Sequence, residues 1–233
     1  MFPKWNRSKP SKPRKIRGCV EPSDGFNLSN VILAIDTSTA ACTTALFEET
    51  GECLAYREEI IGRGHSERLV PMLDELLEGR RANLILVGVG PGSFTGIRVG
   101  IAAAQGLAIA WDCQLVGMSS LALLAAGTKS NGPVAAAVDG GHGELFVQEF
   151  DERPLRPLGD LLNLPPVEAA ATISASNVIG PGAATLVEAR GHGKAESAWP
   201  SARNALRILE ALRSLPPKPV YARAPDARTR SAA

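Results

Sequence analysis

The apolar positions of residues 31–60 follow the spacing of strands. VILAI (31–35) is a continuous apolar run rich in β-branched residues, and TTALF (43–47) reads as an alternating return strand after the polar turn DTST. After Gly51, the segment ECLAYREEI has the pattern of a third strand. The folded region is therefore predicted to begin with three consecutive antiparallel strands.

Two helix-length patterns come next. In HSERLVPMLDELLEG (65–79), apolar residues recur at helical spacing and form one stripe, with Gly79 placed to end the helix. Pro71 lacks an N–H group, so the helix either begins near it or kinks there. IRVGIAAAQGLAIAW (97–111) is small or apolar on almost every side. That composition predicts a helix that is buried on several faces or packed in an oligomer.

The remaining pattern indicates a duplication. Strands are predicted at 84–90 and 114–118, and helices at 120–127 and 202–214. VAAAVD (134–139), followed by GGHGELFVQEF (140–150), repeats the apolar strand, terminal Asp, small-residue turn and alternating strand seen around Asp36. We therefore expect two similar α/β halves, at residues 31–127 and 128–233.

Charge is distributed unevenly along the chain. The whole sequence carries a net charge of only +1, yet residues 1–30 hold seven basic and two acidic residues, and residues 31–233 hold 18 basic and 22 acidic ones. The first segment, with four prolines, is predicted to be a disordered extension. A nucleic-acid or membrane-surface arm is the alternative on charge alone. The acidic remainder, poor in aromatic residues, is expected to reach RNA through a partner.

Several kinds of site lack sequence support. The four cysteines form no CxxC pair, and the three histidines are not spaced as a metal pair on a helix, so no metal site is expected. The longest charge-free apolar run, residues 99–111, is shorter than the roughly 20 residues of a membrane helix. A cytoplasmic protein with buried, reduced thiols is the expectation.

Two features carry candidate chemistry. The glycine-rich loop GPGSFTG between strand and helix is typical either of an anion site or of a tight turn packed on a neighbour, and it is neither a Walker A nor a dinucleotide motif. Its candidate residues are Gly90, Gly92, Ser93, Thr95, Gly96 and Arg98. Two strand-ending aspartates either place a carboxylate near magnesium or cap a turn. These degenerate phosphate-loop candidates are Asp36, Thr37, Ser38, Asp139 and Gly140.

Five segments occur together in order and resemble the TsaB (YeaZ) family. They are AIDTSTAACTTAL, GHSERLVPMLDELL, GVGPGSFTGIRVGIAAAQGLA, AVDGGHGELFVQEF and PVYARAPDAR. The resemblance implies a duplicated actin-like, sugar-kinase/Hsp70-type (ASKHA) fold with two RNase H-like halves and a degenerate nucleotide site. It also implies a non-catalytic dimerisation and activating subunit. Its partner TsaD transfers threonylcarbamoyl to N6 of adenosine 37 in tRNAs that read ANN codons.

The resemblance implies partners as well. TsaE is the ATPase of the complex, ATP is used by the complex with no cofactor held tightly by this chain, and the subunit alone forms a homodimer. Two helices of the family, matching residues 66–78 and 97–110, pack against TsaD or a second copy. The interface candidates are Leu69, Met72, Leu73, Leu76, Ile97, Ile101, Ala104 and Ala108. The basic extension and the shortened C-terminal half depart from the family pattern. An autonomous actin-fold kinase or M22-type peptidase is the alternative.

Overall fold

The first sheet is built as its sequence pattern predicts. A computed structural model describes residues 31–152 and 155–221, so the basic extension and the end of the PVYAR motif lie outside the described residues. Five strands lie in the order β3-β2-β1-β4-β5, with β2 antiparallel to β1 and β3, and β4 parallel to β1 and β5. They are β1 (Val31–Asp36), β2 (Ala41–Glu48), β3 (Cys53–Ile60), β4 (Leu84–Gly88) and β5 (Gln114–Met118).

The second sheet repeats this topology. Its strands lie in the order β11-β10-β6-β7-β8, with β7 antiparallel to β6 and β8, β10 parallel to β6 and β11, and β9 added to β7. They are β6 (Val134–Gly141), β7 (Glu144–Glu152), β8 (Leu155–Pro157), β9 (Leu162–Leu164), β10 (Asn177–Ile179) and β11 (Lys194–Glu196). The predicted fold class, α/β with two RNase H-like halves, is confirmed.

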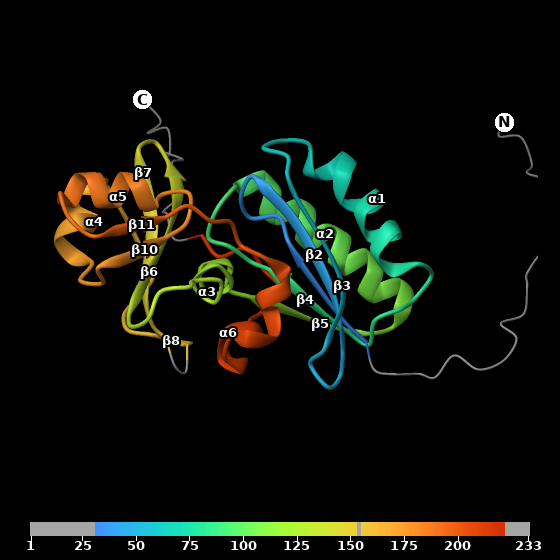
Figure 1. Cartoon of the computed structure of the whole chain (residues 1–233). Helices are drawn as coiled ribbons and strands as arrows, with labels where there is room; N and C mark the ends of the chain where they lie inside the picture. Colours follow the sequence, from blue (N-terminus) through green and yellow to red (C-terminus); the bar gives the residue numbers. More distant parts are fainter. Residues whose placement is uncertain (1–30, 153–154, 222–233) are drawn as a thin grey trace, which may run out of the picture.

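Helices divide the molecule into layers (Figure 1). One outer layer holds α1 (His65–Leu77) and α2 (Phe94–Trp111) on the first sheet, and the other holds α4 (Pro166–Thr172) and α5 (Ala183–Arg190) on the second. Between the sheets lies α3 (Ser120–Ala125), in a core that joins Phe47 of the first sheet to Phe146 and Phe150 of the second. Apolar burial of this kind is the main force that holds the halves together.

The C-terminal segment returns to the first half. The 3-10 helix η1 (Ala202–Arg207) packs on β1, β2 and α3, and α6 (Glu210–Arg213) packs on β5. Leu215 pairs with Gly117 beside β5, and the Val220 amide donates to the Val89 carbonyl at 2.9 Å. The single helix predicted at 202–214 is wrong, because buried Ile208 adopts an extended conformation that separates η1 from α6.

The positions of Pro71 and of the cysteines bear on two expectations from the sequence. Pro71 lies inside α1 rather than at its start. Among the three cysteines of the described ranges, all free, Cys42 is buried but Cys53 is exposed on β3, so the expectation that the thiols are buried is wrong for Cys53. Burial raises the pKa of the Cys42 thiol to about 11, which keeps it protonated and unreactive at neutral pH.

Candidate functional site

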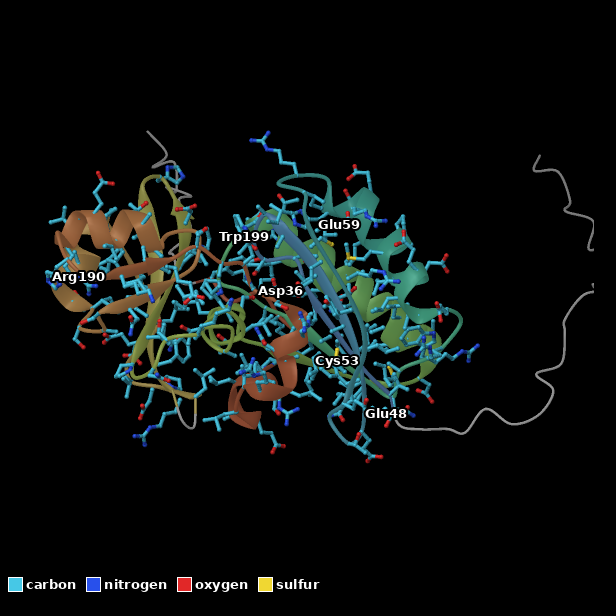
Figure 2. The ribbon with its side chains drawn as sticks, in the orientation of Figure 1. Asp36, Glu48, Cys53, Glu59, Arg190 and Trp199 are labelled. Atoms are coloured by element: carbon cyan, nitrogen blue, oxygen red, sulfur yellow. The ribbon has the colours of Figure 1, made fainter. Side chains whose placement is uncertain are left out.

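The two halves enclose a cleft of about 1090 Å³. Its walls are the segments that follow the carboxyl ends of β1, β4, β6 and β10, where ligands bind in open α/β sheets. The C-terminal segment adds Trp199, Val220 and Tyr221 to the same walls. Figure 2 places Trp199 and Asp36 near the middle of the molecule, between the halves.

Asp36 does not face this cleft. Its side chain is only 1% exposed and accepts hydrogen bonds from the Ser38 amide at 2.9 Å, the Ser38 hydroxyl at 2.7 Å and the Ser120 hydroxyl at 2.6 Å. The Ser120 hydroxyl also accepts a bond from the Gly90 amide at 3.2 Å. Burial raises the pKa of Asp36, and the Ser120 and Ser38 hydrogen bonds oppose that rise. This carboxylate therefore ties β1, α3 and the glycine-rich loop together.

The glycine-rich loop packs directly on the turn after β1. The Ser93 amide donates to the Ser38 carbonyl at 2.7 Å, and Thr37 donates its hydroxyl to the Gly96 carbonyl at 2.7 Å. A Cβ on Gly92 would lie 2.1 Å from the Ser38 carbonyl oxygen, and Gly92 has φ 152°. The geometry fits the tight-turn interpretation of this loop, because glycine permits the close approach of two backbones.

The predicted loop residues divide into two groups. Ser38, Gly92, Ser93, Arg98, Asp139 and Gly140 line the cleft. The others lie outside its lining: Asp36, Thr37, Gly90, Thr95 and Gly96. Of the two interpretations of Asp36, a carboxylate near magnesium or a carboxylate that caps a turn, the geometry fits the second. The reason is that both of its oxygens are occupied by buried serine groups.

An aromatic cluster at the cleft was missed from the sequence. The Arg98 guanidinium carbon lies 3.3 Å from the Phe94 ring centroid, and Arg98 donates to the Tyr221 hydroxyl at 2.7 Å. Arg98 is thus held between two rings, a cation–π arrangement. Phe146 and Trp199 also line the cleft. The only available signal was Phe94 inside GPGSFTG, because Tyr221 and Trp199 are distant in sequence.

Acidic groups are scarce in the cleft. Of the described residues that line it, Asp139 alone is acidic, and it is exposed at the end of β6 beside the turn that carries His142. In residues 31–152 and 155–221, no group of three or more His, Cys, Asp or Glu side chains is placed to hold a metal ion. A single carboxylate is a weak arrangement for binding magnesium and a triphosphate together.

Seven of the eight predicted interface residues lie in the chain's own core. Leu69, Met72, Leu73, Leu76, Ile97, Ile101 and Ala104 are at most 5% exposed, and only Ala108 is half-buried. The prediction that these seven form a partner surface is corrected by their burial against the first sheet. The outward positions of the same helices include Val70, 63% exposed, and Ile109, 83% exposed.

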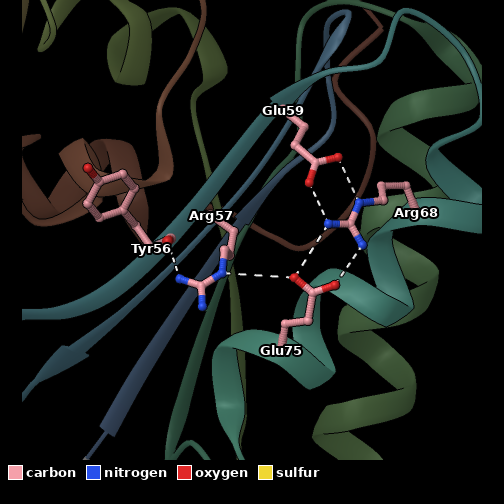
Figure 3. A network of polar contacts seen from close by, with 5 residues as sticks. All are labelled: Tyr56, Arg57, Glu59, Arg68 and Glu75. Carbon is pink, nitrogen blue, oxygen red and sulfur yellow. Dashed lines mark hydrogen bonds and ion pairs between the residues drawn. The ribbon is translucent and has the colours of Figure 1, made fainter.

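An ion-pair network fixes α1 to the sheet edge (Figure 3). Arg68 on α1 binds both carboxylate oxygens of Glu59 on β3, one of them at 2.7 Å, and reaches Glu75 at 3.0 Å. The Arg57 Nε atom lies 4.0 Å from the Oε2 atom of Glu75. Hydrogen bonding to Arg68 lowers the pKa of Glu59 and of Glu75. The network holds the exposed side of α1 in a defined position beside β3.

Helix α2 stands out by its apolar surface. By length and apolar composition, it is the one helix of the described chain that is long and apolar enough to cross a membrane, a test that core helices of soluble proteins also pass. Here α2 packs with one side on β1, β4 and β5. Its other side, which includes Ile109, is left uncovered.

Two RNase H-like halves that face each other across a cleft define the actin-like (ASKHA) class, here with a cleft poor in acidic groups. The family model described as TsaD, tRNA N6-adenosine threonylcarbamoyltransferase, matches residues 58–160. TsaB, the tRNA threonylcarbamoyladenosine biosynthesis protein of Escherichia coli (strain K12), is 40% identical over 51% of this chain and 54% of its own length. The chain thus spans about half the length of such curated relatives.

Solved structures cover more of the chain. A crystal structure of a protein from Pseudomonas aeruginosa with similarity to peptidase YEAZ is 32% identical, with a TM-score of 0.70, over 83% of this chain and 100% of that one. YeaZ from Pseudomonas aeruginosa is 31% identical, with a TM-score of 0.69, over 82% of this chain and 99% of that one. The chain belongs to the TsaB (YeaZ) family.

Proposed function

We propose that this chain is the TsaB-type subunit of a complex that makes threonylcarbamoyladenosine in tRNA. The observation that carries the proposal is the alignment with YeaZ from Pseudomonas aeruginosa over 99% of its length at 31% identity. A second observation supports the proposal: the relative from Escherichia coli that is 40% identical to this chain bears the name TsaB. The complex would act in the cytoplasm.

The proposed role is non-catalytic. In this proposal TsaD transfers the threonylcarbamoyl group to N6 of adenosine 37 in tRNAs that read ANN codons, and TsaE hydrolyses ATP. This chain holds no cofactor tightly and activates TsaD by binding it. The inward-facing Asp36 and the single acidic residue of the described cleft support this role, because phosphoryl chemistry needs a positioned metal and several charged groups.

The proposed partner surface is the outer side of α1 and α2. Val70 and Ile109 are large apolar side chains on neighbouring helices of the first half, and the Arg68 network fixes the position of α1. Single exposed apolar side chains are common on protein surfaces, so the proposal rests on their place on the two helices that the family resemblance implicates in partner binding. TsaD would cover this surface in the complex, and a second copy would cover it in the isolated protein.

Depletion of the protein tests the function. We expect the threonylcarbamoyladenosine content of bulk tRNA, measured by mass spectrometry, to fall on depletion and to return when the wild-type gene is restored. A second modified nucleoside in the same digest controls for tRNA recovery. An unchanged threonylcarbamoyladenosine level in depleted cells would overturn the proposal.

A pair of charge substitutions tests the surface. Ile109→Asp places a charge on the outer side of α2, and we expect it to abolish co-purification with TsaD while the fold is retained. The matched control is Val167→Asp on α4, where Val167 is 73% exposed. Ala104→Arg, which the sequence alone would suggest, enters a fully buried position and tests folding instead. Equal TsaD binding by both variants would exclude this face.

The alternative enzyme class has its own test. An autonomous kinase or ATPase would show magnesium-dependent ATP turnover by the isolated chain, and Asp139→Ala would abolish that turnover, because Asp139 is the acidic side chain that the cleft exposes among the described residues. An M22-type peptidase would cleave peptides without ATP. We expect neither activity above the background measured with heat-denatured protein.

A further inference from the structure

The cleft between the halves combines apolar walls with one basic side chain. Among its described lining residues, Arg98 is the one Lys or Arg residue and Asp139 is the one carboxylate. Large apolar and aromatic side chains form much of the remaining wall, among them Phe94, Ile97, Val138, Phe146, Trp199 and Tyr221. A cavity of about 1090 Å³ with few polar groups among apolar walls is typical of a small-molecule site.

Arg98 is anchored in the cleft wall, but its charge is not neutralised. Its guanidinium carbon lies 3.3 Å from the Phe94 ring centroid, and it donates to the Tyr221 hydroxyl at 2.7 Å. Among the described residues, no carboxylate forms an ion pair with Arg98, and its guanidinium has no hydrogen-bond partner besides Tyr221. Because the Phe94 ring packs against the face of the planar guanidinium, N–H groups at its edge remain available to a ligand.

The charge balance of the cleft favours a ligand with a single negative charge. A phosphate monoester carries a charge of about −1.5 to −2 at neutral pH, whereas an ionised carboxylate carries only one negative charge. One guanidinium neutralises a carboxylate and can bind both of its oxygens side by side. A phosphate group would keep an excess of negative charge, which Asp139 in the same cleft would repel.

We propose that the cleft binds a small aromatic carboxylate, a ligand that the proposed function does not include. The edge of the Arg98 guanidinium binds the carboxylate, and the aromatic ring of the ligand packs against aromatic side chains of the wall such as Phe146 and Trp199. Because Phe94 and Tyr221 already hold Arg98 in place, little side-chain freedom is lost when the ligand binds. The site belongs to this chain alone and needs no contact with TsaD.

Ligand titrations of the isolated full-length chain, followed by NMR, test this site. The probe is phenylacetate; phenylacetamide has the same ring without the charge, and acetate has the charge without the ring. The indole N–H signal of Trp199, which lines the cleft near the middle of the molecule (Figure 2), reports binding. Trp111, at the end of α2 and outside the lining, is the internal control.

Three variants separate the contribution of Arg98 from that of charge in general. Arg98→Gln removes the guanidinium, and Tyr221→Phe removes only the hydroxyl that anchors it. The matched control is Arg81→Gln, which removes an exposed positive charge outside the cleft. Thermal melting of each variant confirms that it is folded.

We expect phenylacetate to shift the Trp199 signal but not the Trp111 signal, and to bind about tenfold more tightly than phenylacetamide or acetate. Arg98→Gln should weaken phenylacetate binding about tenfold and Tyr221→Phe about threefold, while Arg81→Gln has no effect. No shift at millimolar phenylacetate, equal binding of phenylacetamide, or wild-type affinity in Arg98→Gln would overturn the proposal. If Arg98→Gln fails to fold, wild-type affinity in Tyr221→Phe would overturn it instead.

Discussion

The ends of β1 and β6 occupy the same place in the two halves, yet their aspartates have opposite environments. Asp36 is 1% exposed and bound to Ser38 and Ser120, whereas Asp139 is exposed in the cleft. In the first half a helix and a glycine-rich loop pack over the turn, and in the second half the strand continues through an irregularity to Gly141. The same position in the topology thus holds a buried aspartate in the first half and an exposed aspartate in the second.

The largest expected difference is in stability. Asp36→Ala leaves the buried hydroxyls of Ser38 and Ser120 without their acceptor, so we expect the free energy of unfolding to fall by about 3 kcal/mol. Asp139→Ala removes an exposed side chain and should change it by less than about 0.5 kcal/mol. Urea denaturation followed by circular dichroism measures both. Equal losses would show that the two carboxylates do not differ in structural role.

A smaller effect is expected from the glycine that faces Asp36. A Cβ at Gly88 would lie 2.0 Å from an Asp36 carboxylate oxygen, so Gly88→Ala should destabilise the protein by about 2 kcal/mol. Gly106, within α2, has no atom within 4 Å of its Cβ position, and Gly106→Ala should stabilise the helix by about 0.8 kcal/mol. Thermal melting of the two variants shows whether each substitution lowers or raises the stability of the protein. A stabilised Gly88→Ala protein would contradict the contact.

The pH dependence of stability sharpens the comparison further. Because burial raises the pKa of Asp36, the folded protein keeps this proton over a pH range in which the unfolded chain has lost it. The contribution of Asp36 to stability is therefore greatest below about pH 3.9 and falls as the pH rises through its folded pKa. Relative to Asp36→Asn, the wild type should therefore lose stability as the pH rises above about 3.9. If the urea midpoints of the wild type and of Asp36→Asn change in parallel across that pH range, the pKa of Asp36 is not raised.

The smallest expected effect concerns the edge of the first sheet. Arg68→Gln removes the exposed network with Glu59 and Glu75, and we expect a drop of a few degrees in the melting temperature that vanishes at high salt. The matched control is Arg156→Gln, which removes an ion pair to Asp151 in the second half. It should change the melting temperature no more than Arg68→Gln does. A large drop that persists at high salt would show that Arg68 contributes through packing.

Short-range pattern predicted the strands of the first sheet and β6 and β7, because apolar runs such as 31–35 and 84–88 are buried on both faces, but it missed the short strands β8 to β11. It could not tell which neighbour covers an apolar stripe, so residues such as Leu73 and Ala104, which face the first sheet, were taken for a partner surface. The helix predicted at 97–111 begins earlier, at Phe94, because the Ser93 side chain caps it by accepting a hydrogen bond from the Gly96 amide. The break at Ile208 had no local signal, because tertiary contacts set it.

The inward orientation of Asp36 and the aromatic cluster also escaped sequence reasoning. Asp36 is bound by Ser120, and Arg98 by Tyr221, across separations of 84 and 123 residues. Contacts at such separations depend on how the whole chain folds back on itself. Periodicity and local motifs carry no information about them.

The return of the C-terminal segment has a consequence for synthesis on the ribosome. Leu215 pairs beside β5, the Val220 amide binds the Val89 carbonyl, and η1 covers β1 and β2. All strands of the first sheet leave the ribosome long before these residues are made, because chains emerge from the N-terminus onward. The first half must therefore wait, with one face of its sheet incompletely covered, until residues 202–220 have been translated.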